Sequence, residues 1–152
     1  MKDNEIIDFA VDLMMKSKMT YFTTVKECKP YTRALFNLKN ASMFPKQAEY
    51  MNKEGKLSIY LATNTSSEKI EQVKNNPAAA LYYCIPDSFL GAMVGGNVEI
   101  VEDSRIKEGL WQDDWTMYYP KGVGDEDFTV LRMNPEIIRV WISGKGKHEL
   151  KL

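Results

Sequence analysis

The sequence is poor in the residues that build metal centres. Its 152 residues include two cysteines and one histidine. Cys28 and Cys84 lie far apart and neither belongs to a C-x-x-C pair, so a structural zinc site is not expected. We expect both cysteines to be reduced, semi-buried small residues. The single histidine, His148, lies in a charged segment and is predicted to be a solvated tail residue.

An excess of charge and a long apolar run are also missing. Lysine plus arginine number 20 and aspartate plus glutamate 21, which gives a formal net charge of −1. The chain therefore has no overall field that would attract nucleic acid, and any anionic ligand must be held by local charges. No apolar run approaches the roughly 18 residues of a membrane span, and the first residues lack a signal-peptide pattern. We expect a cytoplasmic protein with no membrane partner.

The common catalytic and cofactor fingerprints are absent too. The chain has no G-x-G-x-x-G motif, no Ser-His-Asp arrangement and no carboxylate pair of recognisable spacing. It also has no internal repeat and no low-complexity linker. Its length is that of one domain with a sizeable core, so residues 1–152 are predicted to form a single domain.

A series of short β-type segments is what the sequence does contain. Apolar periodicity and capping residues predict helices over 5–17, 46–53, 68–74 and 104–115. Because these helices do not alternate regularly with the strands, the pattern favours a mainly β fold, an antiparallel barrel with peripheral helices. Runs of β-branched and aromatic residues predict strands over 20–25, 31–38, 57–62, 78–84, 89–102, 128–133 and 137–143.

Some of these strands carry more specific expectations. The turn residues 27–30 predict that the first two strands form a hairpin. The strand 78–84 is nearly all apolar and is predicted to be central and buried on both faces. Gly95-Gly96 predicts a bulge within the segment 89–102, and Asn134-Pro135-Glu136 is predicted to separate the last two strands.

The strongest local signal is the hydroxyl-rich turn Thr63-Asn64-Thr65-Ser66-Ser67, which ends a strand and opens a helix. Helix N-termini present unpaired N–H groups and a partial positive charge, so such a turn suits a phosphate. The alternative is an ordinary capping box, with Thr65 as the cap and Glu68 reaching back. Lys69 favours the anion site, because the helix dipole disfavours a lysine in the first turn unless an anion binds there.

Arg33 is the second signal. Alternation along the strand 31–38 places Arg33 and Leu35 on one face and Ala34 and Phe36 on the other, and the second face is predicted to be core. Arg33 is then either a solvated surface residue or a fork that binds an anion beside the phosphate turn.

Aromatic residues give the third signal. Trp141 shares a strand face with Arg139, away from the apolar face of Ile138 and Val140. A large aromatic residue in that position is either a chance surface residue or part of an interface or ligand contact. A second aromatic group is interpreted as internal packing or a dimer surface, and it contains Trp111, Trp115, Tyr118 and Tyr119.

Taken in order, these segments resemble the pyridoxamine 5′-phosphate oxidase-like, FMN-binding split-barrel family, most closely its short bacterial branch of general stress proteins. The ordered series is more specific than any one segment. The resemblance implies an antiparallel split β-barrel that binds FMN as a homodimer, with each flavin shared by two subunits. The matching segments are 30–35, 59–69, 76–77, 96–103, 110–111, 118–122, 125–128 and Trp141.

The resemblance also implies roles for individual residues. Oxidases of the family carry an arginine and a histidine shortly after the tryptophan, whereas this chain has Lys147 and Glu149, so oxidation of pyridoxamine phosphate is not expected. The strand before the glycine pair, 90–93, also lacks the polar side chains that the oxidases use for flavin. The implied FMN-binding residues are Arg33, Ser67 and Lys69 at the phosphate, Thr63 and Ser66 nearby, Arg33, Ala34, Leu35 and Phe36 along the isoalloxazine ring, and Trp141 from across the interface.

Two functional hypotheses follow. The first is an FMN-dependent oxidoreductase that acts on a small-molecule substrate or electron donor, with NADH or NADPH as candidate donors. The alternative is a non-catalytic flavin or haem protein that stores, senses or delivers its ligand. A dimeric interaction module without a cofactor is a third interpretation.

Overall fold

The fold consists of one antiparallel sheet and four peripheral helices, in a computed structural model that describes all 152 residues. The helices are α1 (Asp3–Lys16), α2 (Pro45–Glu54), α3 (Glu68–Asn75) and α4 (Ser104–Leu110). Three short 3₁₀ turns are η1 (Pro86–Ser88), η2 (Asp113–Met117) and η3 (Gly122–Gly124). The strands are β1 (Met19–Lys26), β2 (Lys29–Phe36), β3 (Ile59–Asn64), β4 (Ala78–Ile85), β5 (Leu90–Val101), β6 (Phe128–Ile142) and β7 (Gly146–Lys151).

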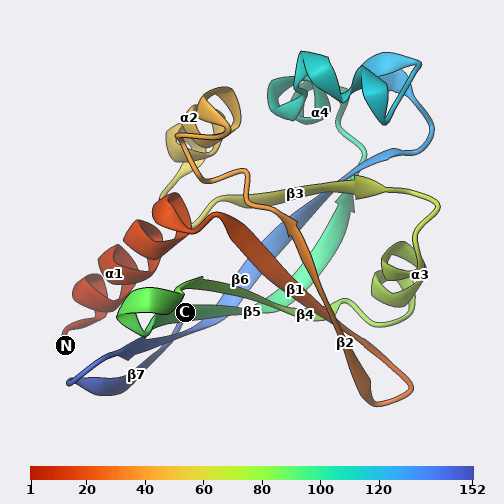
Figure 1. Cartoon of the computed structure of the whole chain (residues 1–152). Helices are drawn as coiled ribbons and strands as arrows, with labels where there is room; N and C mark the ends of the chain where they lie inside the picture. Colours follow the sequence, from red (N-terminus) through yellow and green to blue (C-terminus); the bar gives the residue numbers. More distant parts are fainter.

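The sheet is curled into an incomplete barrel (Figure 1). Hydrogen-bonded neighbours run in the order β2-β1-β4-β5-β6-β3, and β7 pairs with the second half of β6. The two end strands, β2 and β3, contact each other without hydrogen-bonded pairing. We call this opening the β2–β3 seam. The predicted mainly β, antiparallel split-barrel fold is confirmed.

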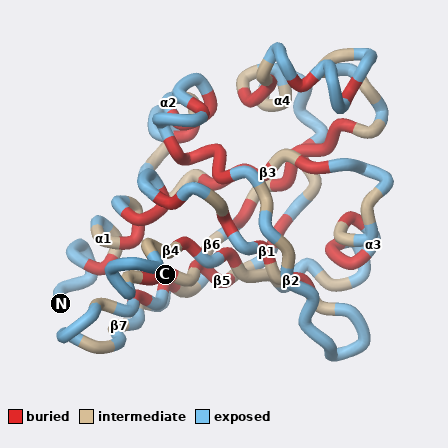
Figure 2. Tube along the Cα trace, in the orientation of Figure 1, coloured by how far each residue is buried: buried red, intermediate tan, exposed pale blue.

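Two clusters of buried side chains stabilise the fold, and Figure 2 shows the buried positions along the chain. The larger, here the aliphatic core, has 18 residues and includes the inner face of α1, from Ile6 to Met14. This confirms the amphipathic helix predicted there. The smaller, here the aromatic core, has 11 residues near α2 and α4. Its aromatic members are Phe44, Tyr60, Trp111, Trp115, Tyr119 and Phe128.

The β1–β2 hairpin turns through Glu27 and Cys28, both with positive φ (51° and 61°). A two-residue turn with this backbone matches the twist of the flanking strands. The predicted hairpin is confirmed, whereas the expectation of two semi-buried cysteines is wrong for Cys28. That residue is exposed because it lies at the tip of the turn, and Cys84 is half-buried.

The predicted bulge is confirmed, but the predicted break in the last long strand is wrong. The β5–β6 register shifts between Gly95 and Gly96, and β6 continues through Asn134 and Pro135. Proline lacks an N–H donor and is tolerated in a strand at such an irregularity. A Cβ on Gly96 would lie 2.0 Å from the Asn134 carbonyl oxygen, so glycine permits this close approach.

The predicted helix over 104–115 is too long. Asp103 caps its start by accepting a hydrogen bond from the Arg105 N–H, as expected, but α4 ends at Leu110. Side chains from α2 bind the carbonyls at this end: Lys46 donates to the Trp111 carbonyl at 2.9 Å and Gln47 to that of Leu110 at 3.3 Å. The last carbonyls of a helix have no partner within the helix, and these two side chains supply one. They thereby stabilise the end of α4 at Leu110, before the chain enters η2.

The other differences concern faces and edges of the sheet. β4 is central, but it is not buried on both faces, because Tyr82 is 42% exposed. The predicted solvated tail is the edge strand β7, where Lys147 and Glu149 are exposed as is common on sheet edges. His148 therefore faces inward and is half-buried, and its Nε2 has no hydrogen-bond partner. Each helix is too short or too polar to span a lipid bilayer.

Candidate functional site

A cavity of about 250 Å³ opens at the β2–β3 seam. β2 pairs only with β1 and β3 only with β6, so both strands present backbone N–H and C=O groups that no other strand binds. Lys69 of α3 supplies the only charged side chain in the wall. The lining residues are Met19, Ala34, Leu35, Phe36, Ala62, Thr63, Asn64, Lys69, Trp115, Tyr118 and Tyr119.

Arg33 lies on the inner face of β2, so the face predicted for that strand was wrong. Ala34 and Phe36 are exposed, whereas Arg33 is half-buried. Its guanidinium donates to Thr24 Oγ1 at 2.8 Å, to Gln72 Oε1 at 2.9 Å and to the carbonyl of Phe22 at 3.3 Å. Strand alternation alone cannot predict these acceptors, because they come from β1 and α3.

Lys69 in the cavity wall and Arg33 beside the cavity are neighbouring cations. Burial lowers the pKa of Lys69 from its ordinary value, and the positive charge of Arg33 lowers it further. Burial also lowers the pKa of Arg33, which the charge of Glu68 partly offsets. Neither cation forms a salt bridge. Two half-buried like charges without a carboxylate partner are suited to bind an anion.

The hydroxyl-rich turn is fixed in place by Asp127. This carboxylate accepts hydrogen bonds from the Asn64 side chain and the Ser66 N–H, both at 2.8 Å. These bonds lower the pKa of Asp127 from its ordinary value. Asp127 thus positions the start of α3 while it remains ionised.

The capping-box alternative is not what the structure contains. Ser67, not Thr65, is the N-cap residue of α3, and its hydroxyl donates to the Asn64 carbonyl at 2.7 Å. Thr65 instead donates to the Glu126 carbonyl at 2.8 Å. The Ile70 N–H donates to the Ser67 carbonyl at 3.1 Å, but no side chain caps the first turn of α3, so the N–H groups of Glu68 and Lys69 are left for water or an anion.

The aromatic wall of the cavity was interpreted from the sequence as packing or a dimer surface, and it also borders the site. Trp115 and Tyr119 are buried members of the aromatic core, while Tyr118 is 52% exposed. Burial, followed by the charges of Asp127 and Asp125, raises the pKa of Tyr119 to about 12. Tyr118 and Tyr119 begin a short segment, 118–125, that contains Pro120, Gly122 and Gly124; this composition is typical of a loop and was the available sequence signal, since binding residues are often on loops. The lining residues that sequence reasoning missed are Met19, Ala62, Asn64, Trp115, Tyr118 and Tyr119.

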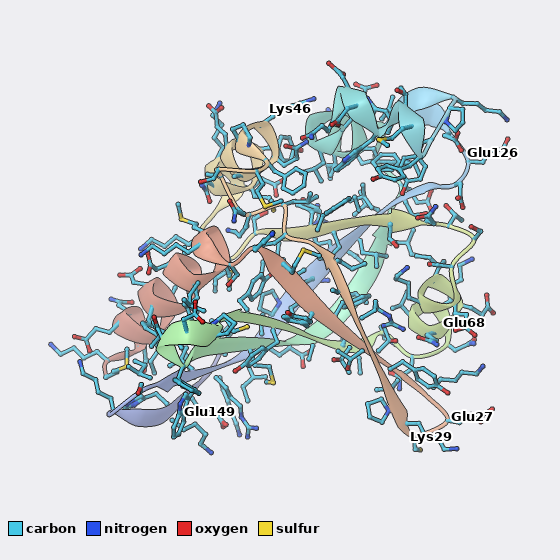
Figure 3. All side chains as sticks on the ribbon, in the orientation of Figure 1. Glu27, Lys29, Lys46, Glu68, Glu126 and Glu149 are labelled. Carbon is cyan, nitrogen blue, oxygen red and sulfur yellow. The ribbon has the colours of Figure 1, made fainter.

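Most of the predicted site residues lie together at the seam. Trp141 does not: it pairs with Gly91 and with Lys147 of β7 and is 51% exposed. Figure 3 shows Glu149, also on β7, at the opposite end of the molecule from Glu126, which contacts the α3 turn. Ala34, Leu35, Phe36, Thr63 and Lys69 line the cavity, and Arg33, Ser66 and Ser67 lie beside it.

The cavity contains no histidine and no cysteine. His148 is on β7, outside the cavity wall. The chain also has no group of three or more His, Cys, Asp or Glu side chains arranged to hold a metal ion. The cavity therefore offers apolar surface, free backbone polar groups and one cation, Lys69, with Arg33 as a second cation beside it.

A family model, a sequence relative and a solved structure all relate this chain to one protein family. Residues 33–152 match the family model described as "Pyridoxamine 5'-phosphate oxidase like". General stress protein 26 of Bacillus subtilis is 22% identical over 148 residues, which covers 95% of this chain and 94% of that protein. A crystal structure of a related protein from Clostridium acetobutylicum, of the pyridoxinephosphate oxidase family, is 27% identical with a TM-score of 0.77. The alignment covers 99% of this chain and 97% of the Clostridium acetobutylicum chain.

More distant structures with the same fold differ in the ligand they are described as binding. A pyridoxamine 5′-phosphate oxidase-related, FMN-binding protein from Nostoc punctiforme is 12% identical with a TM-score of 0.55, covering 96% of this chain and 86% of that one. A haem-binding protein from Mycobacterium smegmatis is 13% identical with a TM-score of 0.67, and the alignment covers 96% of this chain and 57% of the Mycobacterium smegmatis chain. At these identities the likeness concerns the fold alone.

Proposed function

The chain belongs to the pyridoxamine 5′-phosphate oxidase-like family, and we propose that it binds FMN in the cavity at the β2–β3 seam. One observation carries the proposal: an apolar, aromatic-walled cavity has one cationic side chain in its wall, Lys69, with the neighbouring cation Arg33 beside it, and neither forms a salt bridge. FMN has the matching shape, a planar ring system at one end and a phosphate at the other. Arg33, Lys69 and the uncapped start of α3, with Ser66 and Ser67, would hold the phosphate.

The ring would lie against the seam. Ala34 to Phe36 and Thr63 provide backbone polar groups at strand edges without neighbours, and Trp115 and Tyr118 provide apolar surface. Sites for small molecules are mostly apolar with a few polar groups that fix orientation, and this lining has that character.

We propose further that a second copy of the chain completes the site. The cavity of about 250 Å³ is smaller than the roughly 300–1,000 Å³ typical of small-molecule sites, and Phe36 and Tyr118 remain exposed beside it. Trp141 is exposed on a sheet face that also exposes Tyr21 and Tyr82. Trp141 does not line the cavity of its own chain, and in a homodimer it would act on the partner's flavin.

Bound FMN would supply hydride or electron transfer, while the protein anchors the phosphate and orients the ring. We therefore propose an oxidoreductase, with NADH or NADPH as the electron donor to test first. Anaerobic addition of each nucleotide to the flavin-loaded protein should bleach the flavin absorbance with one of them. Absence of bleaching with both would exclude the nicotinamide-dependent reaction.

The test of FMN binding is a titration followed by flavin absorbance and fluorescence. The parent protein should take up FMN, and Arg33→Ala and Lys69→Ala should each raise the Kd about tenfold or more, because each removes a charge-assisted contact to phosphate. Arg105→Ala is the matched control, since Arg105 is an arginine whose side chain is 88% exposed on α4. A parent protein that takes up no FMN would refute the cofactor assignment.

A non-catalytic binder is the second candidate, favoured by the residues that follow Trp141. Lys147 and Glu149 lie on β7, and Glu149 is bound to Arg139 in a salt bridge instead of being free to bind a substrate. In the haem version, replacement of His148, the only histidine, tests axial ligation. A haem spectrum that is unchanged in His148→Ala would count against it.

A further inference from the structure

Gln72 of α3 is buried although it is a polar residue on a peripheral helix. Its exposed fraction is 4%, and its Oε1 accepts hydrogen bonds from Arg33 Nη2 at 2.9 Å and from the hydroxyl of Thr24. Arginine can only donate, so the amide orientation of Gln72 is fixed with its oxygen toward the guanidinium. The opposite end, Nε2, is buried without a partner. Gln72 thus leaves one of its own polar atoms unsatisfied while it binds Arg33.

Thr24 completes the network around the guanidinium. Its hydroxyl accepts from Arg33 Nη1 at 2.8 Å and donates to Gln72, so both of its hydrogen-bonding roles are used. The ring of Phe22 lies 5.6 Å from the guanidinium carbon and adds a cation–π contact. Every group that contacts Arg33 in this network is neutral.

The other arginines of the chain differ from Arg33 because each forms a salt bridge. The sequence has four arginines, and Arg105, Arg132 and Arg139 each have a carboxylate at ion-pair distance, namely Asp103, Glu99 and Glu149. A carboxylate in the place of the Gln72 amide would neutralise Arg33 internally. Neutral acceptors fix the geometry of the guanidinium and leave its charge available.

We propose that Gln72 is a positioning residue that holds Arg33 in place for a phosphate without placing a negative charge against the guanidinium. This inference rests on the proposed function, because it assigns the discrimination between phosphorylated and unphosphorylated flavin to the Arg33–Thr24–Gln72 network. Lys69 adds the second charge, and Gln72 itself makes no contact with the ligand in this scheme.

The test is Gln72→Glu, which replaces the amide with a carboxylate of the same shape. FMN and riboflavin, which lacks the phosphate, are titrated separately and followed by flavin fluorescence. The Kd for FMN should rise about tenfold or more, because an internal ion pair then competes with the phosphate, while that for riboflavin should change less than about twofold. Asn75→Asp is the matched control: it adds the same charge at an exposed position of α3, and we expect it to change neither Kd more than about twofold.

A second variant and a mutant cycle protect the test against a simple structural effect. Gln72→Met removes the acceptor without adding charge and should reduce the preference for FMN less than Gln72→Glu does. In an Arg33→Ala background, Gln72→Glu should produce no further loss of FMN preference. Equal losses of FMN and riboflavin affinity, or a full additional loss in the Arg33→Ala background, would overturn the positioning role. Equal binding of FMN and riboflavin by the parent protein would overturn the phosphate site, and this inference with it.

Discussion

The aliphatic core and the aromatic core both include side chains from strands of the same sheet, but they differ in their relation to the site. No buried member of the aliphatic core lines the seam cavity, whereas Trp115 and Tyr119 of the aromatic core do. Aliphatic side chains interdigitate at high density, while rigid rings leave flat surfaces that meet edge to face, as Trp111 and Trp115 do at 5.9 Å. The aliphatic core is thus suited to stability and the aromatic core to forming a ligand surface.

The largest effect on stability is expected from the aliphatic core. Leu13 on α1 is 1% exposed, so Leu13→Ala should lower the free energy of unfolding by about 2–5 kcal/mol, measured by urea denaturation. The Kd for FMN, measured where the variant is still folded, should stay close to that of the parent. A large loss of FMN affinity in the folded variant would contradict the separation between the two cores.

A charged group buried beside the aromatic core should give the next effect. Lys39 follows Leu38 of that core, is 2% exposed and donates to the Lys56 carbonyl at 2.6 Å. Burial lowers its pKa from 10.5 to about 8. Between these values the unfolded chain binds more protons than the folded one, so Lys39 makes stability rise with pH.

The contribution of Lys39 should amount to roughly 3 kcal/mol across this interval, given 1.36 kcal/mol per pKa unit. The measurement is urea denaturation of the parent and Lys39→Met at several values between pH 8 and 10.5. Other titrating groups are common to both proteins, so the difference between the two curves isolates Lys39. Parallel curves would show that this lysine is charged at no cost in the folded state.

The elements of the fold could be predicted from the sequence because their signals are local. Gly95-Gly96 marked the bulge, and the residues of the Glu27-Cys28 turn marked the hairpin. β7 was missed because the exposed Lys147 and Glu149 make this short segment look like a charged tail. In an edge strand with alternating burial, such charges occupy the outer face and are compatible with strand structure.

The candidate site could be predicted only in part. The phosphate turn and Lys69 are contiguous in sequence, so their association was visible. The inward direction of Arg33 was not, because it depends on acceptors on β1 and α3 that approach only in the folded chain. Trp115 and Tyr119 were recognised as a cluster, yet their place in the cavity wall follows from the η2 turn, where a longer helix was expected.

The exposed rim of the aromatic region should affect binding more than folding. Tyr118 is half-exposed, so Tyr118→Ala should change the free energy of unfolding by about 1 kcal/mol or less. Because Tyr118 lines the cavity, the same variant should weaken FMN binding and shift the flavin spectrum. Unchanged spectrum and Kd would place the ring elsewhere and remove Tyr118 from the site.

Trp141 should have the smallest effect on the isolated chain, about 1 kcal/mol or less, because half of its surface is exposed and it belongs to neither core. If a second copy covers this sheet face, Trp141→Ala should convert a dimer to monomer in sedimentation equilibrium and weaken FMN binding together. Phe89→Ala is the control, since Phe89 is more exposed (74%) but lies in the turn after η1. A dimer that persists with full FMN affinity would separate Trp141 from the site. Loss of both the dimer and FMN affinity would give Trp141 a role distinct from those of the two cores, because it would then complete the site between chains and not within one.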